Sequence, residues 1–163
     1  LNSYSSTVEY ATKTTSMVDV QEHIFVQAML YKGVSLKELQ QFDLALSVLD
    51  STTKLTKSVE AAQAKYYKCE ILYTQGNYEQ CENEIMELVQ QKPSYDYWLA
   101  KGIILLGDNF VALGDYFNAK HSLQSIVDNY SGDSKAELVK MAQEKFNKVT
   151  QAYNRIMDSR KDA

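Results

Sequence analysis

The sequence contains few of the residues that end helices or build small reactive sites. Its 163 residues include one proline, two cysteines, two histidines and one tryptophan. Because proline is scarce and Ala, Leu, Lys, Glu and Gln are common, we expect an almost wholly helical chain. No window alternates apolar and polar residues over the length of a strand. The sequence therefore predicts no β-sheet.

Long apolar runs and an excess of positive charge are also absent. No run approaches the roughly 20 apolar residues of a membrane-spanning helix. The net charge is −4, and the lysines are scattered along the chain. An acidic chain without a basic stripe has no electrostatic attraction for nucleic acid or anionic lipid. We therefore expect no nucleic-acid partner and no direct membrane span.

Catalytic and metal-binding motifs are missing as well. His23 and His121 each lack a second histidine at the spacing of a metal site. Gly102, Gly107 and Gly114 are spaced for helix packing and lack the strand that precedes a phosphate-binding loop. The sequence predicts a protein that is not an enzyme and that binds no metal or cofactor.

One short pattern occurs three times in the chain. The segments KELQQFDLA (37–45), YTQGNYEQC (73–81) and VALGDYFNA (111–119) align on the aromatic residues Phe42, Tyr78 and Tyr116, at intervals of 36 and 38 residues. Small residues recur nine positions before the aromatic residue and three positions after it. The first column holds Gly33, Cys69 and Gly107, and the second holds Ala45, Cys81 and Ala119. The turn column is Gln40, Gly76 and Gly114.

A period in the mid-thirties with a turn at its centre is typical of a solenoid of helix hairpins. Two antiparallel helices approach closely only where their side chains are small, so we expect Gly107 to face Ala119. The turn glycine can adopt a positive φ and end the first helix.

The repeat divides the chain into five parts of a single domain. We predict hairpins at 26–59, 62–95 and 100–133. We also predict a capping helix at 134–160, with an apolar stripe on one side and a strongly charged surface on the other. Residues 1–25 are interpreted as the helical remnant of a preceding repeat. The chain begins Leu-Asn-Ser, without methionine. We expect a fragment of a longer protein or a mature form that has lost a leader.

These columns resemble the tetratricopeptide repeat, which has a small residue in its first helix, a Gly-Asp/Asn-Tyr turn and an alanine in its second helix. The third copy is the most similar. The second departs from the pattern with Lys65 and Lys68, where apolar residues are usual, and the first is the most degenerate. The resemblance implies an all-α fold, a right-handed α-solenoid of about three hairpins with a C-terminal capping helix.

Residues 64–133 are also similar to tetratricopeptide-repeat proteins of the bacterial cell envelope, including outer-membrane assembly lipoproteins. This second resemblance implies a periplasmic or cell-envelope location. A cytoplasmic location stays open.

In the resembling family, the first helices line a concave groove that binds peptides. Tyr66 and Tyr73 are seven residues apart, on one face of a predicted first helix. The groove implied by the resemblance consists of Gln63, Tyr66, Glu70, Tyr73, Lys101, Ile104 and Asp108. The alternative is that the tyrosines are half-buried or covered by a terminal helix. Of the lysines and asparagines with which some family members bind a terminal carboxylate, only Lys101 is present, so we expect no such ligand.

Cys69 and Cys81 occupy the two small-residue columns of one repeat, which face each other in the resembling fold. Each can serve as a small buried apolar residue. A disulfide that joins the two helices is the alternative if the compartment is oxidising.

The function that these features predict is that of a scaffold that binds another protein or a peptide. Two alternatives remain open. One is a structural or oligomerisation segment of a larger envelope protein, with a homo-oligomer as its form. The other is a glycan-associated binder that uses an exposed Trp98 with Tyr95 and Tyr97 as a stacking surface.

Overall fold

The computed structural model describes residues 2–161, and within them the chain forms eight α-helices and no strand. The helices are α1 (Asn2–Ser16), α2 (Glu22–Glu38), α3 (Phe42–Leu55), α4 (Val59–Thr74), α5 (Tyr78–Gln90), α6 (Asp96–Ala112), α7 (Tyr116–Asn129) and α8 (Lys135–Lys161). The predicted all-α fold is confirmed. No described helix combines the length and the apolar character that a membrane span requires.

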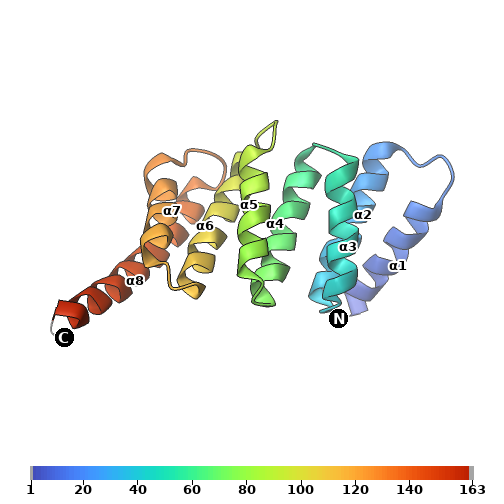
Figure 1. Cartoon of the computed structure of the whole chain (residues 1–163). Coiled ribbons are helices and arrows are strands. Elements are labelled where there is room, and N and C mark those ends of the chain that lie inside the picture. Colours follow the sequence, from blue (N-terminus) through green and yellow to red (C-terminus); the bar gives the residue numbers. More distant parts are fainter. Residues whose placement is uncertain (1, 162–163) are drawn as a thin grey trace.

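Three antiparallel hairpins, α2–α3, α4–α5 and α6–α7, stand side by side in a row (Figure 1). Helix α1 precedes the row and contacts α2, and α8 follows it and contacts α6 and α7. This arrangement is the predicted helical repeat solenoid. The repeats expected at 26–59, 62–95 and 100–133 each start within the first turns of α2, α4 and α6. Residue 1 of the expected 1–25 remnant lies outside the described residues.

The two sets of helices in the stack make different contacts with their neighbours. The first helices contact one another in sequence, α2 with α4, α4 with α6 and α6 with α8. The second helices α3, α5 and α7 make no such contacts with one another in the described structure. The first helices are therefore on the inner side, and we call the surface formed by α2, α4, α6 and α8 the concave face.

All three hairpins turn in the same way. Gln40, Gly76 and Gly114 have φ values of 60°, 76° and 76°, and each is followed by an N–H that donates to a carbonyl five residues earlier. In the second hairpin, for example, Asn77 donates to the Leu72 carbonyl at 2.8 Å. This Schellman geometry satisfies the last carbonyls of each first helix. The turn column read from the sequence is therefore a column of left-handed residues.

The hairpin helices cross closely at Gly33 and Gly107, where a leucine of the second helix lies against the glycine. A Cβ atom added at Gly107 would lie 2.7 Å from Leu123 Cγ, and one added at Gly33 would lie 2.6 Å from Leu49 Cδ2. The three atoms nearest to an added Cβ at Gly107 all belong to Leu123, one turn after Ala119 on α7. A contact between Gly107 and Ala119 stays a prediction. Ala119 is fully buried elsewhere in the same core.

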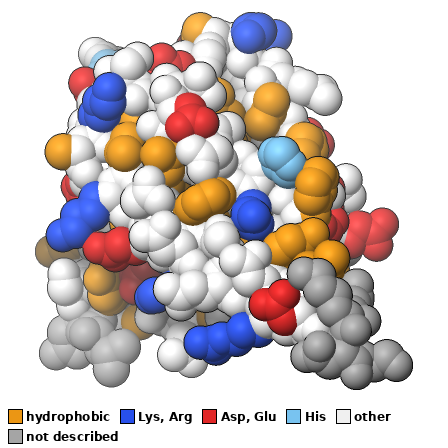
Figure 2. All heavy atoms as spheres, turned by 90° about the vertical axis from the view of Figure 1, so that its left-hand side faces the viewer, with side chains coloured by type: hydrophobic (Ala, Val, Ile, Leu, Met, Phe, Trp, Pro, Cys, Tyr) orange, Lys and Arg blue, Asp and Glu red, His pale blue; other side chains and the backbone are white. Residues whose placement is uncertain are grey.

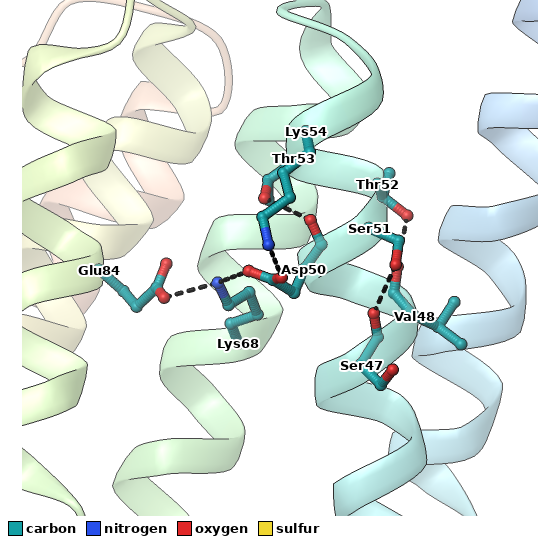
Figure 3. A network of polar contacts seen from close by, with 9 residues as sticks. All are labelled: Ser47, Val48, Asp50, Ser51, Thr52, Thr53, Lys54, Lys68 and Glu84. Atoms are coloured by element: carbon teal, nitrogen blue, oxygen red, sulfur yellow. Dashed lines mark hydrogen bonds and ion pairs between the residues drawn. The ribbon is translucent and has the colours of Figure 1, made fainter.

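Lys68 departs from the apolar pattern because it forms an ion-pair network between repeats (Figure 3). Its buried Nζ lies 3.0 Å from Asp50 Oδ1 of α3 and 2.6 Å from Glu84 Oε1 of α5. Burial by itself would lower the pKa of Lys68, but the hydrogen bonds and charges of Glu84 and Asp50 outweigh it, and the pKa is raised. The network joins three consecutive helices through one cation.

We predict that Gly107→Ala lowers the free energy of unfolding by about 1–3 kcal/mol, because the new methyl group overpacks the crossing against Leu123. Urea denaturation of both proteins measures the difference. In a Leu123→Ala background the same substitution should cost little, since the overlapping atoms are gone. A Gly107→Ala protein as stable as the parent would contradict this view of the crossing.

We predict that Lys68→Met lowers the free energy of unfolding at pH 7 by about 1.5–3 kcal/mol, the usual range for hydrogen bonds to charged groups. A raised lysine pKa contributes stability below the unfolded value of about 10.4, and the contribution disappears as the pH rises through the folded value. The difference between parent and variant should therefore shrink above about pH 10.4. Denaturation at a series of pH values measures it, with Lys54→Met, an exposed partner of the same Asp50, as the control.

Candidate functional site

A cleft on the concave face lies between the ends of α2 and α4 and the middle of α6. Its volume is about 440 Å³. The lining residues are Lys37, Glu38, Gln40, Phe42, Glu70, Ile71, Tyr73, Thr74 and Leu105. We call this feature the concave cleft. Its residues come from the last turns of α2 and α4, from the turn between α2 and α3, from the first residue of α3, and from the middle of α6.

An ion-pair cluster forms one wall of the concave cleft. Lys37 Nζ of α2 lies 2.8 Å from Glu70 Oε2 of α4 and 3.0 Å from Glu38 Oε1. The hydroxyl of Tyr66 donates to the other carboxylate oxygen of Glu70 at 2.6 Å. Burial opposes the charge of Lys37, but its two carboxylate partners outweigh burial and raise its pKa. Glu70 is therefore held by a cation and a hydroxyl from two helices.

An aromatic cluster lies beside the ion pairs, between α4 and α6. The ring of Trp98 is 5.5 Å from that of Tyr66, 5.8 Å from that of Tyr67 and 5.1 Å from that of Tyr97. These four rings form the aromatic cluster. Tyr66 is only 7% exposed, and burial together with the hydrogen bond to Glu70 raises the pKa of its phenol.

Lys101 lies over the aromatic cluster. Its Nζ is 4.3 Å from the centroid of Tyr66, 5.1 Å from that of Trp98 and 5.9 Å from that of Tyr97, distances at which ring faces attract a cation. Among the described residues it forms no ion pair with a carboxylate. Burial lowers the pKa of Lys101, and the nearby charge of Glu70 opposes this shift without cancelling it.

The far end of the concave face is covered in part by α8. Lys145 Nζ of α8 lies 2.9 Å and 2.8 Å from the two carboxylate oxygens of Asp108 on α6. Tyr73 of α4 lies near this pair, and burial and the charge of Asp108 raise its pKa. Asp108 is thus neutralised by this chain.

The structure brings together only some of the groove residues expected from the sequence. Glu70 and Tyr73 line the concave cleft, and Lys101 is half-buried beside it. Tyr66 and Ile104 are buried, so neither forms an accessible floor of a groove. Gln63 is half-buried on α4, and it is not among the cleft residues.

Several cleft residues were missed by the sequence analysis. Lys37 stands in the same repeat column as Tyr73. Applying the groove positions of the second repeat to the first repeat would therefore have predicted Lys37. Leu105 stands in the column of Tyr67. No sequence pattern indicated Thr74 or Glu38, which lie in the cleft because α2 and α4 end beside each other.

The stacking surface expected of a glycan binder is not exposed. Trp98 is half-buried, with Tyr66, Tyr67 and Tyr97 around it and the ammonium of Lys101 over its ring. The hydroxyl of Tyr95 donates to the carbonyl of Lys57 at 3.2 Å. The expectation of an exposed Trp98 is wrong, because Tyr66 and Tyr67 of α4 pack against its indole.

The two cysteines are free thiols, and both are buried in one core cluster. The hydrogen bond between the two side chains, followed by burial, raises the pKa of Cys69. They act in the structure as small packing residues, one from each helix of the second hairpin. The described residues contain no group of three His, Cys, Asp or Glu side chains that could hold a metal ion.

We predict that Tyr66→Phe lowers the free energy of unfolding by about 1.5–3 kcal/mol, because a buried hydroxyl loses its hydrogen bond to a charged carboxylate. Tyr67→Phe is the matched control, since the neighbouring hydroxyl makes no hydrogen bond to a described residue and its removal should change stability little. Urea denaturation followed by Trp98 fluorescence measures both. Equal stability of the two variants would contradict the assigned role of Glu70.

Comparison with known proteins identifies one part of the chain. Residues 104–133, which span the second half of α6, all of α7 and all but the last residue of the following loop, match the family model described as Tetratricopeptide repeat. No curated protein and no solved structure is significantly similar to the chain. The match lies within the third hairpin and its following loop, and the resemblance read from the residues of this hairpin agrees with it.

Proposed function

We propose that the chain is a protein-binding scaffold that holds a peptide segment of another protein in the concave cleft. The carrying observation is the cleft itself, which has a volume of about 440 Å³ and is lined by residues of three first helices. Tetratricopeptide repeats generally mediate protein–protein interactions. The match of residues 104–133 to that family supports a binding role rather than a catalytic one.

The charges of the concave face favour a particular kind of peptide. The carboxylates of Glu70 and Asp108 are each neutralised by a lysine of this chain, Lys37 and Lys145. Lys101 is a half-buried cation without such a partner among the described residues. A peptide with an acidic side chain near Lys101 would therefore form an ion pair without breaking one within this chain.

The apolar part of the cleft also supports a peptide ligand. Tyr73 and Leu105 line it from two different helices, and both are half-buried, so each has surface to offer a partner. Tyrosine gives a large contact area at a low cost in rotamer entropy. We propose that an apolar side chain of the peptide packs between them, next to the acidic residue.

The proposed setting is the bacterial cell envelope, because residues 64–133 resemble repeat proteins of that compartment. A cytoplasmic setting is the alternative. A structural or oligomeric role is also a proposal, and sedimentation of the purified chain over a range of concentrations distinguishes it from a monomeric scaffold.

We predict that Tyr73→Ala and Lys101→Ala each weaken binding of a peptide by about ten-fold, equivalent to ~1.4 kcal/mol. The peptides would be selected from a displayed library on the complete chain, and fluorescence anisotropy would measure their affinity. Tyr73→Ala removes apolar contact and Lys101→Ala removes the charge pair, so peptides that lack an acidic residue should respond to the first variant alone.

Leu44→Ala and Met86→Ala are matched controls, because both side chains are exposed on the second helices, outside the concave cleft. They should leave affinity unchanged. Selected peptides that bind the cleft variants and the parent equally well would remove the concave cleft from consideration.

A further inference from the structure

A second groove lies at the N-terminal end of the stack, between α1 and α2. Its volume is about 310 Å³. It is lined by Thr7, Tyr10, Ala11 and Thr14 of α1 and by Ile24, Gln27, Ala28 and Tyr31 of α2. Both sets follow the i, i+3, i+4, i+7 spacing of a helix face. We call this feature the end groove.

The end groove is apolar and open. Its floor is made of two small buried residues, Ala11 and Ala28, and its sides carry exposed apolar groups. Tyr10 is 67% exposed, Tyr31 58% and Ile24 41%. Small residues on a floor between large side chains fit the rounded surface of a third helix.

The contact pattern of the repeats says which helix would fit. Helices α4 and α6 each contact four others, the second helix before them, their own hairpin partner, and the first helices on both sides. Helix α2 contacts α1, α3 and α4, and α1 contacts only α2 within the described structure. A first helix ahead of α1 would supply both the contact that α1 lacks and the one that α2 lacks.

The sequence of α2 supports the same position. Residues 27–32 read QAMLYK and residues 63–68 of α4 read QAKYYK, at the same place in the repeat. In α4 this surface is covered by the preceding first helix. Ala64 is fully buried in the core cluster that contains Leu30 of α2, and Lys37 of α2 lies 5.3 Å above the ring of Tyr67. In α2 the matching Ala28 and Tyr31 face the end groove.

We propose that the end groove binds an amphipathic helix of a partner polypeptide, in the place of the first helix of a further repeat. The helix lies beside α2 and antiparallel to α1, with large apolar side chains directed at Ala11 and Ala28. Tyr31 is the repeat equivalent of Tyr67, over whose ring Lys37 of the preceding first helix lies. A lysine at the matching position of the bound helix would therefore lie over Tyr31.

The opposite end of the stack explains why the occupant is not a second copy of this chain. Helix α8 also stands in a first-helix position, but one complete stripe along it is polar and exposed. This stripe consists of Glu137, Lys140, Glu144, Asn147, Lys148, Gln151, Asn154, Arg155 and Asp158. Figure 2 looks at this end, where hydrophobic side chains gather on one side and charged and other polar side chains lie over much of the rest. Such a stripe offers little apolar surface to Tyr10 and Tyr31 of another molecule.

The test supplies a helix for the end groove from the chain's own sequence. Residues 22–41, which are α2 and its turn, are repeated in front of residue 1 of the complete chain, so that the added helix and α1 form a hairpin. We expect amide hydrogen exchange in α1 to slow by about ten-fold or more. We also expect the Tm to rise by about 2–4 °C for each kcal/mol of added stability.

The matched control carries the same extension with its copies of Leu30, Val34 and Leu36 changed to serine. A second control, Tyr10→Ser with Tyr31→Ser, changes exposed side chains and should reduce the gain in the extended chain. Equal exchange rates of α1 in the apolar and the serine extensions would overturn the proposal. So would concentration-dependent protection of α1 and α2 in the unextended chain, because a second copy would then be the occupant. The end groove shares no lining residue with the concave cleft, so either proposal can fail without the other.

Discussion

Two helices of a hairpin can approach closely only where the residues between them are small, and this constraint applies to all three hairpins. At Gly33 and Gly107, the space that a Cβ would need is occupied by Leu49 and Leu123, which insert their branched ends against the opposite backbone. Both leucines are fully buried. Because the first and third hairpins close in this way, the remaining surface of each first helix is free to contact the next repeat and to form the concave face.

Polar contacts between repeats supplement this apolar packing. Lys68 joins α3, α4 and α5 through Asp50 and Glu84, and the fully buried Asn109 of α6 donates to the carbonyl of Tyr78 at the start of α5 at 3.0 Å. Buried polar groups are costly unless they find partners, so such contacts are satisfied in only one alignment of neighbouring hairpins. They explain how the second hairpin, which has cysteine in place of glycine and alanine, retains its position in the stack.

The two ends of the stack differ in a way that follows from the same repeat geometry. Helix α8 contacts α6 and α7 with one face and exposes a polar stripe on the other, as a cap does. Helices α1 and α2 instead expose tyrosines and an isoleucine around a floor of alanines. The concave cleft and the end groove are thus different kinds of surface. The first is partly charged, and the second is mostly apolar.

The repeat period, the glycine and aromatic columns and the scarcity of proline were enough to predict the hairpins, because each depends on contacts between residues close in sequence. The turn at Gly76 and the small residues at the crossings are examples. The candidate site could be predicted only in part, since it depends on how successive first helices lie against one another. Sequence alone could not show that Tyr66 is buried beneath Lys101 while Tyr73 remains accessible, because both occupy the same helix face. The tertiary structure decided this through α6, whose Trp98 and Lys101 cover one turn of α4 and leave the next turn open.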